Sequence, residues 1–323
     1  MLKRILSVFE PFILTLVGTV VLASLFPPRG VFVAIFDAAA DIGIVLLFFL
    51  HGAKLSREAV IAGAKNWKLH LAVFAFTYAV FPVLGLGLTA LPILSGSVAA
   101  GVLFLTLLPS TVQSSIAFTA IARGNVAAAL CSASFSNLIG IFLTPALVAL
   151  LMSGAAGMGG VSFASVEKIL LQLLLPFVVG HLMRPWIGGW VTRNKKLVTM
   201  VDRGSILLVV FTAFGAAVVA GLWSQVSGLD LALIFAVSCV LLAIVLGGTW
   251  GVAKAMKLPR EDAIVLLFCG SKKSLASGVP MAGVLFPASQ IGMVLLPVML
   301  FHQLQLIVCA IIAKRLADQP AES

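Results

Sequence analysis

The stretch FCGSKKSLASGVPM, residues 268–281, places a glycine, several hydroxyl groups and two adjacent lysines inside an apolar run, 262–286. The run is long enough for a membrane helix, since about 20 apolar residues cross the hydrocarbon core of a bilayer. A lysine near the middle of such a helix costs at least about 2.5 kcal/mol, and charges at that depth usually mark functional sites. The stretch therefore predicts a membrane helix that is broken near its middle and carries a function there.

The composition of the whole chain predicts a polytopic membrane protein. Of its 323 residues, 61% are apolar and 10% are charged, whereas about a quarter of the residues of a soluble domain are charged. This composition excludes a soluble enzyme, a secreted disulfide scaffold and a disordered chain. The basic residues form no single patch that could bind a nucleic acid. Ten runs are apolar and long enough to span a lipid bilayer: 11–26, 31–51, 69–91, 97–122, 125–152, 165–183, 203–223, 229–253, 262–286 and 289–313.

The basic residues between these runs set the predicted orientation. With a cytoplasmic N-terminus, most of the 21 lysines and arginines fall on the cytoplasmic side, and only Arg29 and Lys168 fall in segments on the other side. We therefore expect both termini in the cytoplasm. The compact loops and the absence of a transit peptide favour a bacterial inner membrane.

The two halves of the chain resemble each other in the same order. FILTLVGTVVLASLFPP (12–28) resembles LLQLLLPFVVGHLMRP (170–185), and LFLTLLPSTVQSS (103–115) resembles VLLFCGSKKSLAS (265–277). Because five spans per half is an odd number, the second half is inverted relative to the first, as in secondary transporters.

These patterns predict an all-α integral membrane protein with a single membrane domain over residues 1–323. Its ten transmembrane helices form two inverted five-helix repeats, at about 1–155 and about 160–318, with discontinuous crossing helices 4 and 9. Pro109 in the fourth span and Gly270 in the ninth introduce the interruptions, and broken helices near the midplane form the binding sites of such transporters. The alternative is two ordinary kinked helices whose hydroxyl groups bond to their own carbonyls.

The polar residues at these interruptions, and those that break the fifth and last spans, are the candidate site. The fifth span is unusually polar around its asparagine, and a histidine with two glutamines, the second of them Gln305, interrupts the last span. The candidates for substrate binding are Lys273, Gln113, Ser271, Ser274, His302 and Gln303. The candidates for coupling or for an ion site are Lys272, Ser114, Ser115 and Asn137.

The two adjacent lysines admit two interpretations. They could form structural ion pairs with one of the few acids, namely Asp37, Asp41, Asp202 or Glu10. A role in substrate binding or coupling is the alternative that we favour. The four cysteines lie in apolar runs without metal-ligand spacing, and no catalytic motif is present. We therefore expect no metal, no cofactor and no enzymatic activity.

At these motifs the sequence resembles the bile acid:sodium symporter family, solute carrier family ten, over essentially the whole chain. The most specific segments are PSTVQSSIAFTAIARGN (109–125), LTP (143–145) and FCGSKKSLASGVPM (268–281), and the last is close to the member-seven branch and its bacterial relatives. The resemblance implies a panel domain of spans 1, 2, 6 and 7 and a core domain of spans 3–5 and 8–10.

The resemblance also suggests what each candidate position does in the family. Ser114 and Ser115 match sodium ligands, but Phe268 stands where the family has a sodium-binding glutamate. Lys272 and Lys273 replace a glutamine and an asparagine, and Ala129 and Ala133 replace hydroxyl residues. The pair His302-Gln303 matches a His-Asn pair that lines the substrate cavity. Most of the sodium chemistry is therefore missing.

We conclude from the sequence that the chain is a secondary transporter for a small organic anion, with sodium-independent function. A lysine can occupy the place of the cation, and we expect Lys272 to donate to Ser114, Ser115 and freed carbonyls, while Lys273 faces the substrate. Function is then uncoupled, or coupled to protons through Lys272. One alternative is a non-transporting regulator or receptor on the same scaffold. Another is a lysine Schiff-base pigment, but the ten spans and the inverted repeat oppose this second alternative. The sequence leaves the oligomeric state open.

Overall fold

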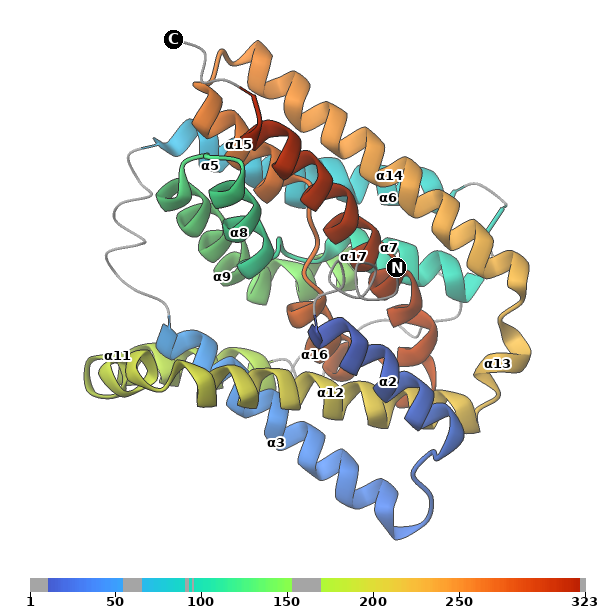
Figure 1. Ribbon diagram of the computed structural model, residues 1–323. Helices are drawn as coiled ribbons and strands as arrows, with labels where there is room; N and C mark the ends of the chain where they lie inside the picture. Colours follow the sequence, from blue (N-terminus) through green and yellow to red (C-terminus); the bar gives the residue numbers. More distant parts are fainter. Residues whose placement is uncertain (1–10, 55–65, 91–92, 95, 153–169, 320–323) are drawn as a thin grey trace. The chain divides into compact units, whose positions relative to one another are not determined.

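The computed structural model describes residues 11–54, 66–90, 93–94, 96–152 and 170–319 (Figure 1). Within these ranges the chain forms helices and no strands, which confirms the predicted all-α class for them. In chain order the helices are α2 (Pro11–Leu25), α3 (Val31–Lys54), α5 (Trp67–Ala75), η2 (Phe76–Val80), α6 (Phe81–Thr89), α7 (Gly96–Leu107), α8 (Gln113–Ile121), α9 (Val126–Leu151), η3 (Leu170–Leu174), α11 (Leu175–Arg193), α12 (Lys195–Val219), α13 (Leu222–Gln225), α14 (Gly228–Ala255), α15 (Arg260–Gly270), α16 (Leu275–Leu285) and α17 (Ala288–Ala317).

Many of these helices have the length and composition of membrane spans. Among the described residues, 6 helices or helix runs are long and apolar enough to cross a bilayer: α3, Trp67–Thr89, α9, α12, α14 and α17. Two shorter apolar helices are Leu14–Leu25 and Val98–Leu107. The protein is therefore an integral membrane protein, and the arrangement as ten inverted spans stays a prediction. Parts of the third and sixth predicted spans, residues 91 and 165–169, lie outside the described residues.

The structure differs from the prediction between the sixth and seventh spans. The predicted sixth span ends at residue 183 and the seventh begins at residue 203, but α11 continues to Arg193 and α12 already begins at Lys195. Arginine and lysine have high helix propensity, so basic residues can end an apolar run without ending the helix. Only Asn194 leaves the helical backbone, with φ −101° and ψ 38°.

The described residues form two compact units. Unit 1 consists of residues 11–54, 149–152, 170–228 and 278–296. Unit 2 consists of the described residues of 66–148, together with 229–277 and 297–319.

In unit 1, α3 packs against α11 and α12, and α2 packs against α12 (Figure 1). Two glycines bring α3 and α11 together. A Cβ atom on Gly52 would lie 2.0 Å from the carbonyl oxygen of Phe177, and one on Gly180 would lie 2.0 Å from that of Phe49. Small residues allow membrane helices to approach this closely.

The carboxylate of Asp202 also belongs to the packing of unit 1. Asp202 on α12 forms an ion pair with Lys54 at the end of α3. This acid was one of the candidate partners for the lysines of the ninth span, and the structure pairs it with a lysine of its own unit.

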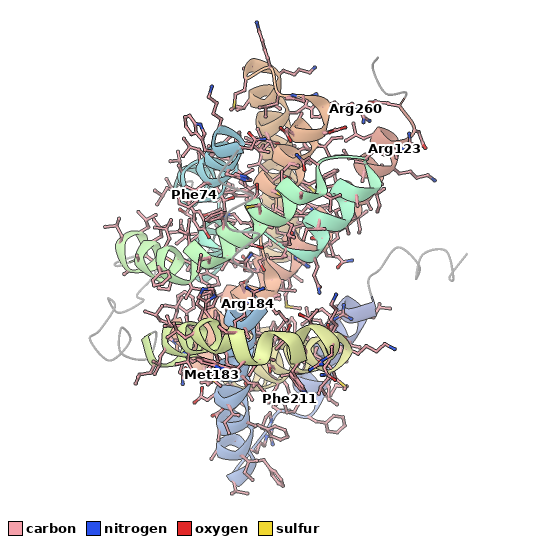
Figure 2. All side chains as sticks on the ribbon, turned by 90° about the vertical axis from the view of Figure 1, so that its left-hand side faces the viewer. Phe74, Arg123, Met183, Arg184, Phe211 and Arg260 are labelled. Atoms are coloured by element: carbon pink, nitrogen blue, oxygen red, sulfur yellow. The ribbon has the colours of Figure 1, made fainter. Side chains whose placement is uncertain are left out.

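Unit 2 contains the two predicted helix interruptions, and both are confirmed. Residues 108–112 separate α7 from α8, and residues 271–274 separate α15 from α16. At one end of the unit, where Figure 2 shows Arg123 and Arg260, the loop after α8 is bonded to the start of α15. There Asn125 donates its main-chain N–H to the carbonyl oxygen of Glu261 at 3.1 Å and its side-chain amide to Asp262 at 2.9 Å. These bonds fix α8 relative to α15.

Candidate functional site

The two helix interruptions meet inside unit 2. The main-chain N–H of Ser274 donates to the carbonyl oxygen of Pro109 at 2.8 Å, and the hydroxyl of Ser110 donates to the carbonyl oxygen of Cys269 at 2.6 Å. Proline has no N–H and cannot continue α7, while the residues after Gly270 leave the helix with their main-chain groups free to bond elsewhere. The two segments, far apart in the sequence, therefore form one polar centre.

The ammonium group of Lys273 lies at this centre and is fully buried. Its Nζ donates to the carbonyl oxygens of Thr77, Thr106 and Leu108, each at 2.7 Å. An ammonium has three N–H donors, so all of them are used. The ring centroid of Phe81 lies 4.2 Å from Nζ, a distance at which an aromatic face stabilises a cation. We call the three carbonyl oxygens, of Thr77, Thr106 and Leu108, the carbonyl cage.

The carbonyl of Thr77 is free because the third predicted span contains a π-helical turn, η2. In this turn the N–H of Phe81 donates to the carbonyl of Phe76 and not to that of Thr77. The next residue, Pro82, has no N–H to offer. The carbonyl of Thr77 thus loses both helical donors that could reach it, and Lys273 supplies one instead. Single π-turns of this kind are frequent at functional sites.

The other two cage carbonyls are freed by the end of α7. The N–H of Ser110 would reach the carbonyl of Thr106 in a continued helix, but it donates to the hydroxyl of Ser136 on α9 at 3.0 Å. Leu108 lies within the interruption itself. Two spans therefore contribute carbonyls that point at one cation.

The main chain of Lys273 is held by a side chain of α17. The N–H of Lys273 donates to Oε1 of Gln305 at 2.9 Å, and Nε2 of Gln305 donates back to the carbonyl of Lys273 at 2.8 Å. The same Nε2 lies 2.8 Å from Nδ1 of His302, which accepts from it when the neutral imidazole carries its proton on Nε2. Gln305 thus supplies the hydrogen bonds that a continuous helix would give the main chain of Lys273, and it fixes the position from which the lysine side chain extends.

Lys272 has a different environment. It is also fully buried, but its Nζ has no hydrogen-bond partner among the described residues. Instead it lies 4.2 Å from the ring centroid of Phe118 and 5.3 Å from that of Phe268. Both rings belong to or pack against an apolar cluster that also includes Cys309. Among the described residues, the contacts of the Lys272 amino group are therefore with aromatic faces and not with hydrogen-bond acceptors.

The hydroxyls of Ser114 and Ser115, which were predicted to receive Lys272, both contact the hydroxyl of Thr111, and that of Ser115 also bonds to the main chain. Ser114 donates to Oγ1 of Thr111 at 2.8 Å, and Thr111 and Ser115 lie 3.0 Å apart through their hydroxyls. Ser115 donates to the carbonyl of Phe268 at 3.0 Å. The contact with freed carbonyls, which we expected of Lys272, is made by Lys273, because the cage faces the side of the segment from which Lys273 projects.

Asn137 on α9 joins the two interruptions. Its amide donates to the carbonyl of Ser110 at 2.7 Å and accepts from the hydroxyl of Ser277 at 2.7 Å. Ser274 caps the start of α16, because its Oγ accepts from the N–H of Ser277 at 3.2 Å. The predicted candidates Asn137 and Ser274 therefore lie together at the centre.

Three other predicted residues lack such contacts in the part of the chain that the structure describes. Gln113 is exposed at the first position of α8, and Ser271 bonds back to the carbonyl of Leu267 on its own helix. Gln303 is half-buried on α17, and its Oε1 has no partner among the described residues. Their predicted contact with a substrate stays a prediction.

The sequence reasoning missed the residues that build the carbonyl cage. The contributions of Thr77, Thr106 and Leu108 come from the main chain, so their side chains give no signal. Pro82 is the one available hint, because a proline inside a membrane span removes a helical donor. Gln305 was noticed as a polar interruption, but its bonds to Lys273 could not be predicted from its own helix.

Comparison with known proteins relates the whole chain to transporters. The model of a family described as the SBF-like CPA transporter family matches residues 10–318. "Putative symporter YfeH" of Escherichia coli (strain K12) is 54% identical over 322 residues, which cover 98% of this chain and 95% of that protein. "Uncharacterized protein PA2026" of Pseudomonas aeruginosa is 54% identical over 310 residues, with 95% and 93% covered.

A more distant relative carries a name that states its solutes. "Sodium/bile acid cotransporter 7" of Rattus norvegicus is 26% identical over 282 residues, which cover 84% of this chain and 81% of that protein. The match agrees with the predicted likeness to the member-seven branch.

Proposed function

The chain belongs to the SBF-like CPA transporter family, which confirms the resemblance to the bile acid:sodium symporters and a role in transport rather than catalysis, and we propose that it is a secondary transporter moving a small organic anion by alternating access. The observation that carries this proposal is the centre of unit 2. There, two broken helices meet around two buried ammonium groups, as at the midplane sites of secondary transporters.

The preference for an anion rests on unbalanced positive charge. In the described part of the chain, the recorded contacts of Lys272 and Lys273 are to carbonyl oxygens and aromatic rings, and not to carboxylates. In addition, α8 starts at the interruption without a side-chain cap, so its first N–H groups add partial positive charge. A positive potential in a site of low dielectric constant favours a small anion such as a carboxylate.

Sodium independence rests on the carbonyl cage. Lys273 occupies oxygens that a free cation would otherwise use, and Phe268 stands where the symporter family supplies a carboxylate. A second cation beside these ammonium groups would be repelled in a low-dielectric site. We therefore exchange the two roles predicted from the sequence: Lys273 replaces the cation, and Lys272 is left for substrate or coupling.

The same geometry makes Lys272 the candidate coupling residue. A proton can leave Nζ of Lys272 without breaking a hydrogen bond, whereas a proton that leaves Lys273 takes one of three bonds with it. Two relatives are named symporter or cotransporter, words for proteins that move a solute together with a coupling ion, and in this chain we assign that ion as a proton.

The remaining architecture is proposed on the same basis. The ten spans form inverted repeats with both termini in the cytoplasm of a bacterial inner membrane. Spans 1, 2, 6 and 7 form a panel and spans 3–5 and 8–10 a core, and their relative movement exposes the site to each side in turn. Two compact units within the described residues support this division, although residues 278–296 group with unit 1.

An anion screen tests the proposal. The purified protein is heated with a panel of small mono- and dicarboxylates and sulfonates, and those that raise its melting temperature are labelled and offered to proteoliposomes. We expect at least one to stabilise the protein and to accumulate saturably beyond the level in empty liposomes. Stabilisation without flux would favour the receptor alternative, and neither stabilisation nor flux across the panel would overturn the assignment.

A further inference from the structure

We infer that the carbonyl cage is a binding site for a primary ammonium ion, which Lys273 fills from within the chain and which a free alkylammonium can fill when the lysine side chain is removed. The inference concerns the interior of unit 2 and needs no transported substrate. Its failure would leave the proposed anion transport untouched but would remove the basis for sodium independence, whereas a failure of anion transport would leave the cage untouched.

The number and placement of acceptors set the chemical class of the ligand. Three carbonyl oxygens at 2.7 Å match the three donors of one –NH₃⁺ group. Ammonium itself has a fourth N–H that would point into the space of the lysine stem, where the wild-type chain places methylene groups. A tetraalkylammonium has no donor at all, so it cannot satisfy the cage.

The walls of the cage favour an organic cation over a hydrated metal ion. The ring of Phe81 lies 4.2 Å from Nζ and that of Tyr78 lies 5.8 Å from it. Aromatic faces stabilise a desolvated cation, but they cannot replace the water oxygens that complete the shell of a small alkali ion. A primary alkylammonium also has an apolar tail, which can fill the space left by the methylene groups of Lys273 when that side chain is removed.

The cage is built by the main chain and is not created by the lysine. Two features free the oxygens of the cage without involving the side chain of Lys273. One is the π-turn before Pro82, and the other is the bond from the N–H of Ser110 to the hydroxyl of Ser136, which ends the helical hydrogen bonding of α7. The main chain at position 273 is held by Gln305 through N–H and carbonyl groups that any residue provides. We therefore expect the cage to persist in a Lys273→Ala variant.

The test is chemical rescue of the Lys273→Ala variant. This substitution removes three carbons and the amino group, the equivalent of propylamine. The thermal midpoint of the purified variant is measured at increasing concentrations of n-propylammonium, methylammonium, ammonium, potassium or choline, at constant ionic strength. n-Propanol serves as the uncharged probe. We expect a saturable rise of several degrees with propylammonium, smaller rises with methylammonium and ammonium, and none with choline or propanol. Wild-type protein and Lys272→Ala, whose lost ammonium has no carbonyl partners, should show no saturable rise.

Two further outcomes decide the inference. If Lys273→Ala aggregates during purification, we expect monodisperse protein when propylammonium is present and aggregates in equimolar choline, and aggregation in both would overturn the site. The double variant Lys273→Ala/Pro82→Ala gives Thr77 a main-chain donor, so its response to propylammonium should be weaker. Equal responses of Lys273→Ala, Lys272→Ala and the wild type would show that no ammonium site exists.

Discussion

Lys273→Met is expected to lower the thermal midpoint of the purified protein by roughly 10 °C. Methionine has nearly the volume of lysine but no donor, so the carbonyls of Thr77, Thr106 and Leu108 lose their shared partner inside a fully buried site. An unsatisfied buried polar group costs about 1–3 kcal/mol, and this substitution leaves three buried carbonyls without their donor at once. The loss of midpoint is measured by intrinsic fluorescence or by a thiol-reactive dye during heating.

The matched comparison for this variant is the same substitution one residue earlier. Lys272→Met changes the same side chain in the same broken segment, but it removes an ammonium that has no hydrogen-bond partner among the described residues. A midpoint for Lys273→Met equal to that of Lys272→Met would contradict the carbonyl cage as described.

Lys272→Met is expected to raise the midpoint while anion uptake falls to the level of empty liposomes. Transfer of a charge to an apolar site without hydrogen bonds costs several kcal/mol, and contacts with the rings of Phe118 and Phe268 return only about 2 kcal/mol. A gain of at least about 1 kcal/mol should therefore follow when methionine packs against the same rings. A residue that destabilises the protein and is required for its activity is the signature of a functional site.

The two readouts for Lys272→Met separate a functional lysine from a merely tolerated one. Uptake is compared with that of Lys272→Arg, which keeps a positive charge but cannot release its proton. If Lys272 carries a proton, the arginine variant should bind the anion in the thermal assay yet show no response of uptake to an imposed pH gradient. Wild-type uptake rates in Lys272→Met would remove this residue from the proposed mechanism.

The interruptions of the fourth and ninth spans could be predicted because their causes are local. Pro109 cannot donate and Gly270 tolerates an unwound backbone, so each marks its break in its own segment. The polar side chain of Asn137 could likewise be assigned to the crossing, since an amide in an apolar helix needs a partner on a neighbouring helix. In the structure it bonds to Ser110 and Ser277, one on each side of the centre.

The division of roles between the two lysines could not be predicted from the sequence. Adjacent residues point in different directions, and which of them meets the freed carbonyls depends on the backbone of the break and on a π-turn in another span. Pro82 alone hints at that turn, because a one-residue shift of helical bonding leaves the apolar pattern unchanged. The end of α11 at Arg193 and the start of α12 at Lys195 could not be predicted for a related reason, since basic residues end an apolar pattern without ending a helix.

We propose that this transporter carries its own cation and does not use sodium. The most direct test is uptake of the labelled anion by proteoliposomes at constant ionic strength, with sodium replaced by potassium and then by choline. We predict the same saturable rate in all three salts, because the ammonium of Lys273 already places a cation at the freed carbonyls of the centre and Phe268 supplies no carboxylate for a second one. Uptake that saturates with sodium and vanishes in both potassium and choline would contradict the claim.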